Sequence, residues 1–414
     1  MGVPSESCDY DKPTSQRRLR SSTDDLVARG VLPTRGTVRR RGKKWIIIAD
    51  APRVADEPRR QKTFSGYRTK SDAERDLARI MSEMYGGSFI EPSSMTLCEY
   101  LRYWLDAYAS VNVSAKTLER YREIIERAII PVLGHVKLTK LSPGAIQVFY
   151  STQMTSGGMR GGPLSARTVL HYHRVLHEAL RHAVKWQMLS RSPADAVEPP
   201  RAKGVVVRPL DERECDSLMR AVKSTAYELP VFLAIWTGMR RGEILALRWS
   251  DIDLDRGLAT VTRTLQQTAE GISFKEPKSS KSRRQIALSP ETVLMLKAHK
   301  ARQATTRLLL GADYGGEDLI CARADGTPWK PDGFTASFKG FVSRRGMKTL
   351  RFHDLRHTHA SLLLKGNIHP KIVSERLGHA TIGITLDTYS HLMPGMQEEA
   401  ARSIDSVLAA VSGR

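Results

Sequence analysis

The feature that most constrains the fold is a proline-rich, basic stretch near the middle of the chain. Pro193, Pro199 and Pro200 lead into Arg201-Ala-Lys-Gly204, and neither helical nor strand periodicity continues through it. Proline lacks a backbone donor and interrupts both helix interiors and central strands. We therefore predict a linker over residues 199–209. A chain of 414 residues is long enough for roughly two to four domains around it.

Before the linker, residues 91–198 follow helical periodicity. Thr96 and Glu99 have the spacing of a capping box, and an apolar stripe begins directly after them. Serines in N-cap positions predict the starts of three further helices, at Ser114, Ser142 and Ser165. These short helices predict a compact helical bundle.

The N-terminal part of the chain changes in character near residue 30. Residues 1–30 have few apolar side chains and predict a flexible arm. Residues 31–90 begin with three short strand-like pieces, and we expect a helix to follow from a capping box of Ser71 and Glu74. This pattern predicts a three-stranded sheet packed on one helix.

After the linker, residues 210–414 predict a mixed α/β domain. Helical patterns cover residues 211–223 and 227–235, and strand-like patterns cover 258–264 and 284–288, before helices return toward the C-terminus. The chain as a whole is expected to be mainly α-helical with small β-sheets.

The net charge restricts the partners. The chain has 65 Lys and Arg against 44 Asp and Glu, a net charge of +21, and a field of that sign attracts nucleic acid or anionic membrane. The longest apolar run, Leu229–Trp236, is too short to span a bilayer, and the N-terminus has no apolar signal segment. We therefore expect a cytoplasmic protein that binds DNA and no membrane.

Two basic clusters are candidate DNA-binding surfaces. Residues 31–70 contain 12 Lys or Arg against 3 acidic residues, and a basic β-sheet fits a DNA groove. The candidates in this cluster are Arg39, Arg40, Arg41, Lys43 and Lys44. The candidates on the fourth helix of the bundle are Arg167, Arg174 and Arg181.

The same helix carries histidines that offer an alternative, because His173 and His177 have the i, i+4 spacing of a metal site. No Cys or Asp completes a ligand set there, so a polar, partly DNA-facing surface is the favoured interpretation. The four cysteines lie far apart and form no CxxC pair, which excludes a zinc ribbon. The sequence thus predicts neither a metal nor a cofactor.

Five motifs after the linker carry chemistry. They supply two arginines, a lysine, two histidines and a tyrosine, without a carboxylate cluster for Mg²⁺, and such a cationic set suits a phosphodiester. The motifs are Thr237-Gly-Met-Arg-Arg-Gly-Glu243, Pro277-Lys-Ser-Ser-Lys-Ser-Arg-Arg284, His353-Asp-Leu-Arg-His357, Leu377-Gly-His379 and Leu386-Asp-Thr-Tyr-Ser-His391. We interpret the second motif as the tip of a basic hairpin between two strands.

These motifs resemble those of the tyrosine recombinases, and the chain is similar to the phage-type, three-domain integrases of the lambda-integrase kind. The resemblance implies an active set of six residues: Arg240, Lys278, His353, Arg356, His379 and Tyr389. It favours Arg240 over Arg241 and Lys278 over Lys281 where neighbouring residues compete. Glu243 looks like the family's acidic companion of the first arginine, which orients that arginine.

The resemblance also implies a reaction. Tyr389 would cut DNA through a 3′-phosphotyrosyl intermediate, strands would be exchanged through a Holliday junction, and the outcome would be integration or excision of a phage or mobile element. Arg240 and Arg356 would bind the phosphate, Lys278 would protonate the leaving 5′ oxygen, and His353 would share proton transfer with the tyrosine.

The implied partners are core and arm attachment sites in double-stranded DNA, a homotetramer, and a directionality factor or host DNA-bending protein. Two alternatives stay open: a type IB topoisomerase-like nicking enzyme, and a catalytically inactive DNA-binding regulator of the same fold. A helix predicted from Gln397 onward either packs on its own subunit or docks on a neighbour.

Overall fold

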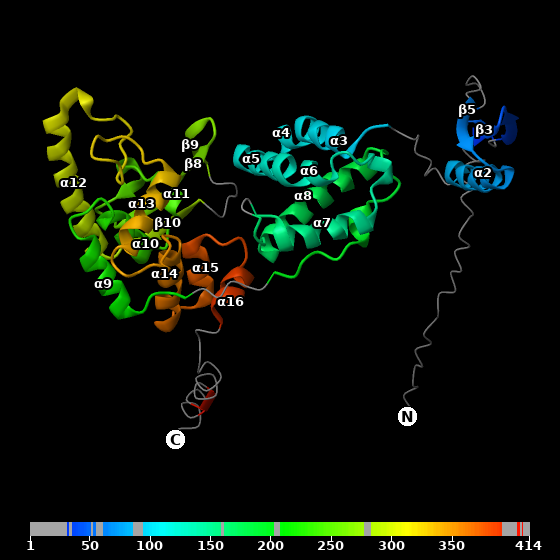
Figure 1. Ribbon diagram of the computed structural model, residues 1–414. Coiled ribbons are helices and arrows are strands. Elements are labelled where there is room, and N and C mark those ends of the chain that lie inside the picture. The colour runs from blue at the N-terminus through cyan, green and yellow to red at the C-terminus, as the bar shows by residue number, and fades with distance from the viewer. Residues whose placement is uncertain are drawn as a thin grey trace, which may run out of the picture. The chain divides into compact units, whose positions relative to one another are not determined.

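The computed structural model describes most of the chain between residues 31 and 390 (Figure 1). The described residues are 31–32, 35–50, 53–54, 61–85, 94–158, 161–202, 208–276, 283–390, 404–405 and 408. They fall into two compact units, one holding the described residues up to Val111 together with Tyr121–Ala202, the other holding Asn112–Arg120 and the residues after the linker. The predicted arm, residues 1–30, and most of the predicted C-terminal helix lie outside the described residues.

A small antiparallel sheet packs on one helix at the N-terminal end, which confirms the predicted arrangement. In spatial order the strands are β2 (Gly36–Arg41), β3 (Lys44–Asp50) and β5 (Gln61–Tyr67). The helix α2 (Lys70–Tyr85) follows, and the core that it shares with the sheet consists of Ile47, Ala49, Ala73, Ile80 and Met84. A second pair of short strands joins β1 (Val31–Leu32) to β4 (Arg53–Val54).

The start of α2 differs from the prediction. Ser71 lies inside the helix, and Thr69 occupies the capping role, because its hydroxyl accepts a hydrogen bond from the backbone N–H of Asp72 at 3.1 Å. Glu74 forms an i, i+4 ion pair with Lys70 at 3.1 Å. The predicted capping box of Ser71 and Glu74 is therefore wrong, because a threonine two residues earlier satisfies the first free donors of the helix.

Residues 94–202, apart from 159–160, form the predicted helical bundle. Its longer helices are α3 (Leu97–Trp104), α5 (Ala115–Ile124), α7 (Pro143–Ser156) and α8 (Ala166–Lys185). Thr96 and Glu99 form the predicted capping box, and Ser142 and Ser165 are N-caps that accept backbone hydrogen bonds. Short α-helical segments, α4 (Ser110–Asn112) and α6 (Ile130–Leu133), extend α3 and α5 beyond a π-helical turn in each.

Two histidines of α8 are hydrogen-bonded inside this bundle. Nδ1 of His173 lies 2.9 Å from the Tyr150 hydroxyl, and Nε2 of His177 lies 2.9 Å from the Asp195 carboxylate. In the part of the chain that the structure describes, no group of three His, Cys, Asp or Glu side chains could hold a metal ion.

The unit after the linker is mixed α/β, as predicted. Its first helices are α9 (Glu212–Val222), α10 (Glu228–Thr237) and the short α11 (Arg241–Ile244). Its strands are β6 (Ile252–Asp253), β7 (Leu258–Val261), β8 (Thr264–Thr268), β9 (Gly271–Lys275) and β10 (Arg284–Ala287). Its later helices are α12 (Pro290–Leu310), α13 (Pro331–Ser343), α14 (Asp354–Lys365), α15 (Pro370–Leu377) and α16 (Ile382–Tyr389).

The apolar helix α10 forms the centre of this unit. Eight of its ten residues are buried, and it packs against α14, α9 and α11. A helix that is apolar on nearly all sides must be covered on all sides, which explains why the later helices surround it. None of the helices in the described ranges has both the length and the apolar character that a bilayer crossing requires.

The strand pairing confirms one part of a prediction and corrects another. The strands predicted at 258–264 and 284–288 pair with each other as β7 and β10, but an unpredicted hairpin lies between them. β9 pairs with β8 in a two-stranded sheet, whereas β10 pairs with β7 in a separate sheet of order β10-β7-β6. The basic segment between β9 and β10 therefore joins two sheets and is not a hairpin tip. Residues 277–282, with Lys278 and its competitor Lys281, lie outside the described residues.

Candidate active site

Gly238 ends helix α10 and turns the chain toward Arg240. Its φ of 67° is in the left-handed region, and a Cβ at this position would lie 2.4 Å from a ring carbon of His359. Helix α11 begins three residues later, at Arg241, with Arg240 in the extended N-cap position. The glycine thus allows an abrupt reversal between two buried helices and places an arginine at the bend.

Arg240 is held by a carboxylate and a main-chain carbonyl. Its Nη1 donates to Oε1 of Glu243 at 2.8 Å, and its Nη2 donates to the carbonyl of Gly378 at 3.0 Å. Arg241 points to a different place, where its Nη1 donates to the carbonyl of Pro331 at 2.8 Å. The structure therefore separates the two neighbouring arginines that compete in the sequence.

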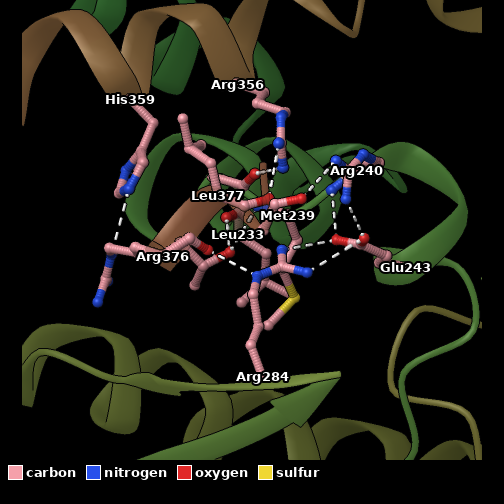
Figure 2. Close-up of polar contacts among 12 residues, drawn as sticks. Leu233, Met239, Arg240, Glu243, Arg284, Arg356, His359, Arg376 and Leu377 are labelled. Carbon is pink, nitrogen blue, oxygen red and sulfur yellow. Dashed lines mark hydrogen bonds and ion pairs between the residues drawn. The ribbon is translucent and has the colours of Figure 1, made fainter. Parts of the chain in front are cut away.

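Glu243 contacts a second arginine, Arg284 of β10 (Figure 2). Nη2 of Arg284 donates to Oε2 at 2.8 Å, Nη1 donates to Oε1 at 3.2 Å, and both side chains are 6% exposed. Burial by itself would raise the pKa of Glu243, but the hydrogen bonds and charges of Arg284 and Arg240 lower it below its ordinary value. The carboxylate is thus ionised and shared between two guanidinium groups.

Arg356 of α14 is held by main-chain carbonyls. Its Nη1 donates to the carbonyl of Gly238 and its Nη2 to the carbonyl of Leu377, each at 2.7 Å. Burial and the nearby charge of Arg240 lower the pKa of Arg356 to about 9, which leaves the group protonated at neutral pH. Two cationic forks therefore lie close together in a partly desolvated place, as a bound phosphate requires.

Arg376 and His359 form a hydrogen-bonded pair next to the arginines described above (Figure 2). Nε of Arg376 donates to Nε2 of His359 at 3.2 Å, and Nδ1 of His359 lies 2.7 Å from the carbonyl of Ile235. Nη2 of Arg376 also reaches the carbonyl of Trp236 at 3.0 Å, and its own carbonyl accepts from Nε of Arg284 at 2.6 Å. These contacts tie the end of α10 to α14, α15 and β10.

His379 follows α15 and makes a hydrogen bond with a buried threonine. Its Nδ1 lies 2.8 Å from the hydroxyl of Thr385. Desolvation and the charges of Arg356 and Arg240 lower the pKa of His379 to about 4, so the ring is neutral at pH 7. If the threonine hydroxyl donates to Nδ1, the ring carries its proton on Nε2 and can donate it to an anion.

Tyr389, the last residue of α16, is 2% exposed. Its hydroxyl lies 2.6 Å from Nδ1 of His357. Burial raises the pKa of Tyr389 to about 12, against an opposing effect of Arg356. The phenol is therefore protonated at neutral pH, and it lies within hydrogen-bond distance of an imidazole.

Four of the side chains described above, Arg240, Arg356, His379 and Tyr389, line one open pocket of about 420 Å³. The lining residues are Arg240, His353, Arg356, His357, Gly378, His379, Ala380, Ile384, Thr388 and Tyr389. The pocket thus contains five of the six residues that the sequence selects as the active set, and no carboxylate is among its described lining residues. The sixth, Lys278, lies outside the described residues.

His357 is the residue that sequence reasoning missed. It belongs to the motif His353-Asp-Leu-Arg-His357, in which the resemblance assigns proton transfer with the tyrosine to the first histidine. The available signal is its position, one residue after Arg356 and one helical turn after His353. That spacing puts both histidines near the same pocket, but it does not tell which ring meets Tyr389.

The predicted DNA-binding residues of the N-terminal sheet are exposed. They are Arg39, Arg40, Arg41, Lys43 and Lys44. Gly36 faces α2, because a Cβ there would meet the Leu77 side chain, so alternation along β2 places Arg39 and Arg41 on the opposite face of the sheet. Arg40 is on the helix side.

The arginines predicted on α8 are also exposed and recur every seven residues along one side of the helix. They are Arg167, Arg174 and Arg181. Arg181 donates to Glu178 at 2.9 Å, so part of its charge is offset within the helix.

Comparisons with known proteins agree along most of the chain. Residues 208–395 match the Phage integrase family, and residues 96–154 match the family described as Phage integrase, N-terminal SAM-like domain. The ICEBs1 integrase of Bacillus subtilis (strain 168) is 30% identical over 308 residues, which cover 72% of this chain and 81% of that protein. The "Tyrosine recombinase XerC-like" protein of Caldanaerobacter subterraneus subsp. tengcongensis is 24% identical over 373 residues, covering 84% and 92%.

Two solved structures share the fold. The Tn1549 transposon integrase in complex with a circular intermediate DNA has a TM-score of 0.64 at 18% identity, covering 76% of this chain and 100% of that chain. A lambda integrase dimer bound to a COC' core site has a TM-score of 0.53 at 22% identity, covering 73% and 96%.

Proposed function

The chain belongs to the phage integrase family of tyrosine recombinases, which are site-specific DNA recombinases, and from this premise we propose how its own residues act. Tyr389 attacks a DNA phosphate, forms a 3′-phosphotyrosyl bond and releases a 5′ hydroxyl. Because the covalent bond keeps the energy of the phosphodiester, the 5′ hydroxyl of a partner strand reverses the step without ATP. Strand exchange through a Holliday junction follows, and a phage or mobile element is integrated or excised.

One observation carries this proposal. Arg240 lies more than 100 residues before Arg356, His379 and Tyr389 in the sequence, yet all four side chains line the same pocket. Two guanidinium forks beside a buried phenol match the needs of a pentacoordinate phosphorus, whose equatorial oxygens gain negative charge in the transition state. Cationic side chains thus supply the charge stabilisation that Mg²⁺ supplies elsewhere.

The remaining roles follow from the chemistry of each group. A neutral His379 donates through Nε2 to a non-bridging oxygen. His353, which also lines the pocket, is the second histidine available for proton transfer. Lys278, whose ammonium group is carried on a flexible stem, protonates the departing 5′ oxygen. Glu243 positions Arg240, because it fixes one edge of that guanidinium group through the contact at 2.8 Å.

The partners are proposed on the same basis. Double-stranded DNA is the substrate, with the net charge of +21 favouring its approach, and the working assembly is a homotetramer on two duplexes. The N-terminal sheet reads arm sites apart from the core sites, the protein acts in the cytoplasm of the host cell, and a directionality factor or DNA-bending protein biases the outcome. A type IB topoisomerase-like nicking enzyme and an inactive DNA-binding regulator are the alternatives. Membership of the integrase family favours the recombinase over both of them.

The test is the variant Tyr389→Phe on a nicked suicide substrate, which traps the covalent adduct. We expect the variant to form no adduct and to bind core-site DNA within a few-fold of the wild type, because only one hydroxyl is removed. Adduct formation by the Phe variant would mean that another residue is the nucleophile. A wild-type protein that forms no adduct at all would favour the inactive regulator.

A further inference from the structure

We propose that His357 directs the hydroxyl of Tyr389 and takes its proton as strand cleavage begins. The inference rests on the proposed function, in which Tyr389 is the nucleophile. It assigns the proton to a histidine other than His353. The carrying observation is the contact of 2.6 Å between Nδ1 of His357 and Oη of Tyr389.

The surrounding geometry favours a directed contact. Tyr389 is 2% exposed and packs among buried apolar residues of α14 and α15, such as Leu364 and Leu377, so its ring has little freedom to rotate. The two rings lie 5.8 Å apart between centroids at 54°. His353 meets His357 edge-on at 5.1 Å, and the hydrogen bond to the phenol is made by His357.

The charges around His357 favour a neutral ring before the reaction. From α14 and the segment just before it, His357 faces Asp354, Arg356, Arg351 and His353. It also faces His379, between α15 and α16, and Tyr389 at the end of α16. Desolvation lowers the pKa of His357, Arg356 and Arg351 lower it further, and Asp354 opposes them. A neutral ring whose Nδ1 accepts from the phenol carries its own proton on Nε2.

The phenol needs such a base, because burial raises its pKa to about 12. In the cleavage step the O–H bond breaks and the proton moves to Nδ1. The electron pair of Oη forms the bond to phosphorus, and the bond from phosphorus to the 5′ oxygen breaks. That oxygen takes a proton from Lys278, as proposed above. In the rejoining step a 5′ hydroxyl gives its proton back to the neutral Lys278 amine as it attacks phosphorus, the bond from phosphorus to Oη breaks, and the imidazolium returns its proton to Oη. The carboxylate of Asp354 stabilises the charged ring in between.

The experiment compares His357→Ala and His357→Asn in the full-length protein. Asn keeps a polar atom near the position of Nδ1 and can hold the hydroxyl, but it cannot accept a proton at neutral pH. The control is His369→Ala, which removes an exposed histidine at the start of α15. The single-turnover rate of adduct formation on a nicked substrate is measured from pH 5 to 9, together with core-site DNA binding and thermal unfolding.

We expect His357→Ala to slow cleavage by about 10² to 10⁴-fold with DNA binding unchanged, the usual range for removal of a general base. We expect the cleavage rate of His357→Asn to fall less than that of His357→Ala, and its dependence on pH to differ from that of the wild type. The wild-type rate levels off once the imidazole is neutral, whereas the Asn rate continues to rise with pH, because only ionisation of the phenol itself remains. His369→Ala keeps the wild-type rate and profile.

Three results would overturn the inference. Cleavage by His357→Ala at the wild-type rate would remove the role altogether, and faster cleavage would show that the contact restrains the tyrosine. If the cleavage rate of the Asn variant still reached the wild-type plateau with pH, the acceptor of the Tyr389 proton would be His353 or His379 instead. If His357→Ala fails to fold, the Asn profile decides. Adduct formation by Tyr389→Phe would instead overturn the proposed function, so the two failures are distinguishable.

Discussion

At the scale of single residues, Glu243 is the carboxylate on which two arginines depend. Replacing it with Gln leaves Arg284 buried with an uncompensated charge, and breaking a buried pair in this way costs about 3 kcal/mol or more. We therefore expect Glu243→Gln to lower the free energy of unfolding by about that amount in urea titrations, and to slow adduct formation because Arg240 is deprived of its partner at 2.8 Å.

The matched control is Glu375→Gln, whose ion pair with Lys371 spans 3.1 Å with both side chains more than 60% exposed. A surface pair of this kind contributes about 0 to 1 kcal/mol. The pH dependence has a definite sign, since the pKa of Glu243 is lowered in the folded protein. Its contribution is present above the ordinary carboxyl pKa and is lost as the pH falls through the lowered value. Equal effects of the two substitutions would contradict the shared-carboxylate description.

The sequence predicted the residues of the pocket better than their contacts. The resemblance carried by the motifs implied five side chains that the structure brings to one place, and each of them sits at a helix end or turn. It could not select His357 over His353, because the two lie one helical turn apart at the start of α14. Which ring meets Tyr389 depends on how α16 packs against α14, a contact between segments more than 30 residues apart.

At the scale of elements, the turn at Gly238 sets the path from α10 into α11. Gly238→Ala would place a methyl group 2.4 Å from His359 and 2.8 Å from Leu377, in addition to the cost of a left-handed φ. We expect a loss of stability well above about 1 kcal/mol and slower cleavage, since the displaced carbonyl of Gly238 is an acceptor of Arg356.

The control for this substitution is Gly346→Ala in the same unit. Gly346 also has a positive φ, 83°, but a Cβ there would have no neighbour within 4 Å. It therefore measures the backbone cost without the collision, about 1 kcal/mol. Thermal unfolding curves that shift equally for the two variants would show that the collision near His359 is relieved at no cost.

The sheet face that carries Arg39 and Arg41 makes a separate prediction about DNA binding. Removing one phosphate contact lowers the salt slope of binding by about one, so Arg39→Ala with Arg41→Ala should flatten the slope on arm-site DNA by about two. The control is Arg75→Ala, which removes a 79% exposed charge from α2. A flatter slope for the control, or an unchanged slope for the double variant, would assign DNA contacts to the helix side.

Element boundaries followed local signals, and strand pairing did not. The capping box at Thr96 and the serine caps were predictable because each uses neighbouring residues, and the error at Ser71 arises where two candidate caps lie two residues apart. The strands predicted at 258–264 and 284–288 do pair, as β7 and β10, but the basic motif between them does not form their turn. Strands that are close in sequence usually pair, but β10 pairs with β7 across an intervening hairpin.

At the scale of the whole molecule, the N-terminal sheet has its own core, and the residues on either side of position 91 belong to no described helix or strand. We therefore expect residues 91–414 to fold and to bind core-site DNA as the full chain does. Footprints of the two proteins on DNA that spans an attachment region should differ only at the arm sites. Identical footprints would mean that the sheet does not read a second site.

The two arginines that we propose bind the phosphate, Arg240 and Arg356, also differ in how mutation can remove their support. A single base change in the codon of Glu243 removes the side chain that holds Arg240. The acceptors of Arg356 are peptide carbonyls, at Gly238 and Leu377, and no codon change deletes a peptide carbonyl. Random mutation can remove these two hydrogen bonds of Arg356 only by changing the path of the backbone at Gly238 or Leu377. As lineages of such a gene diverge, the partner of the first arginine is therefore open to loss by substitution, while the support of the second is inherited with the fold.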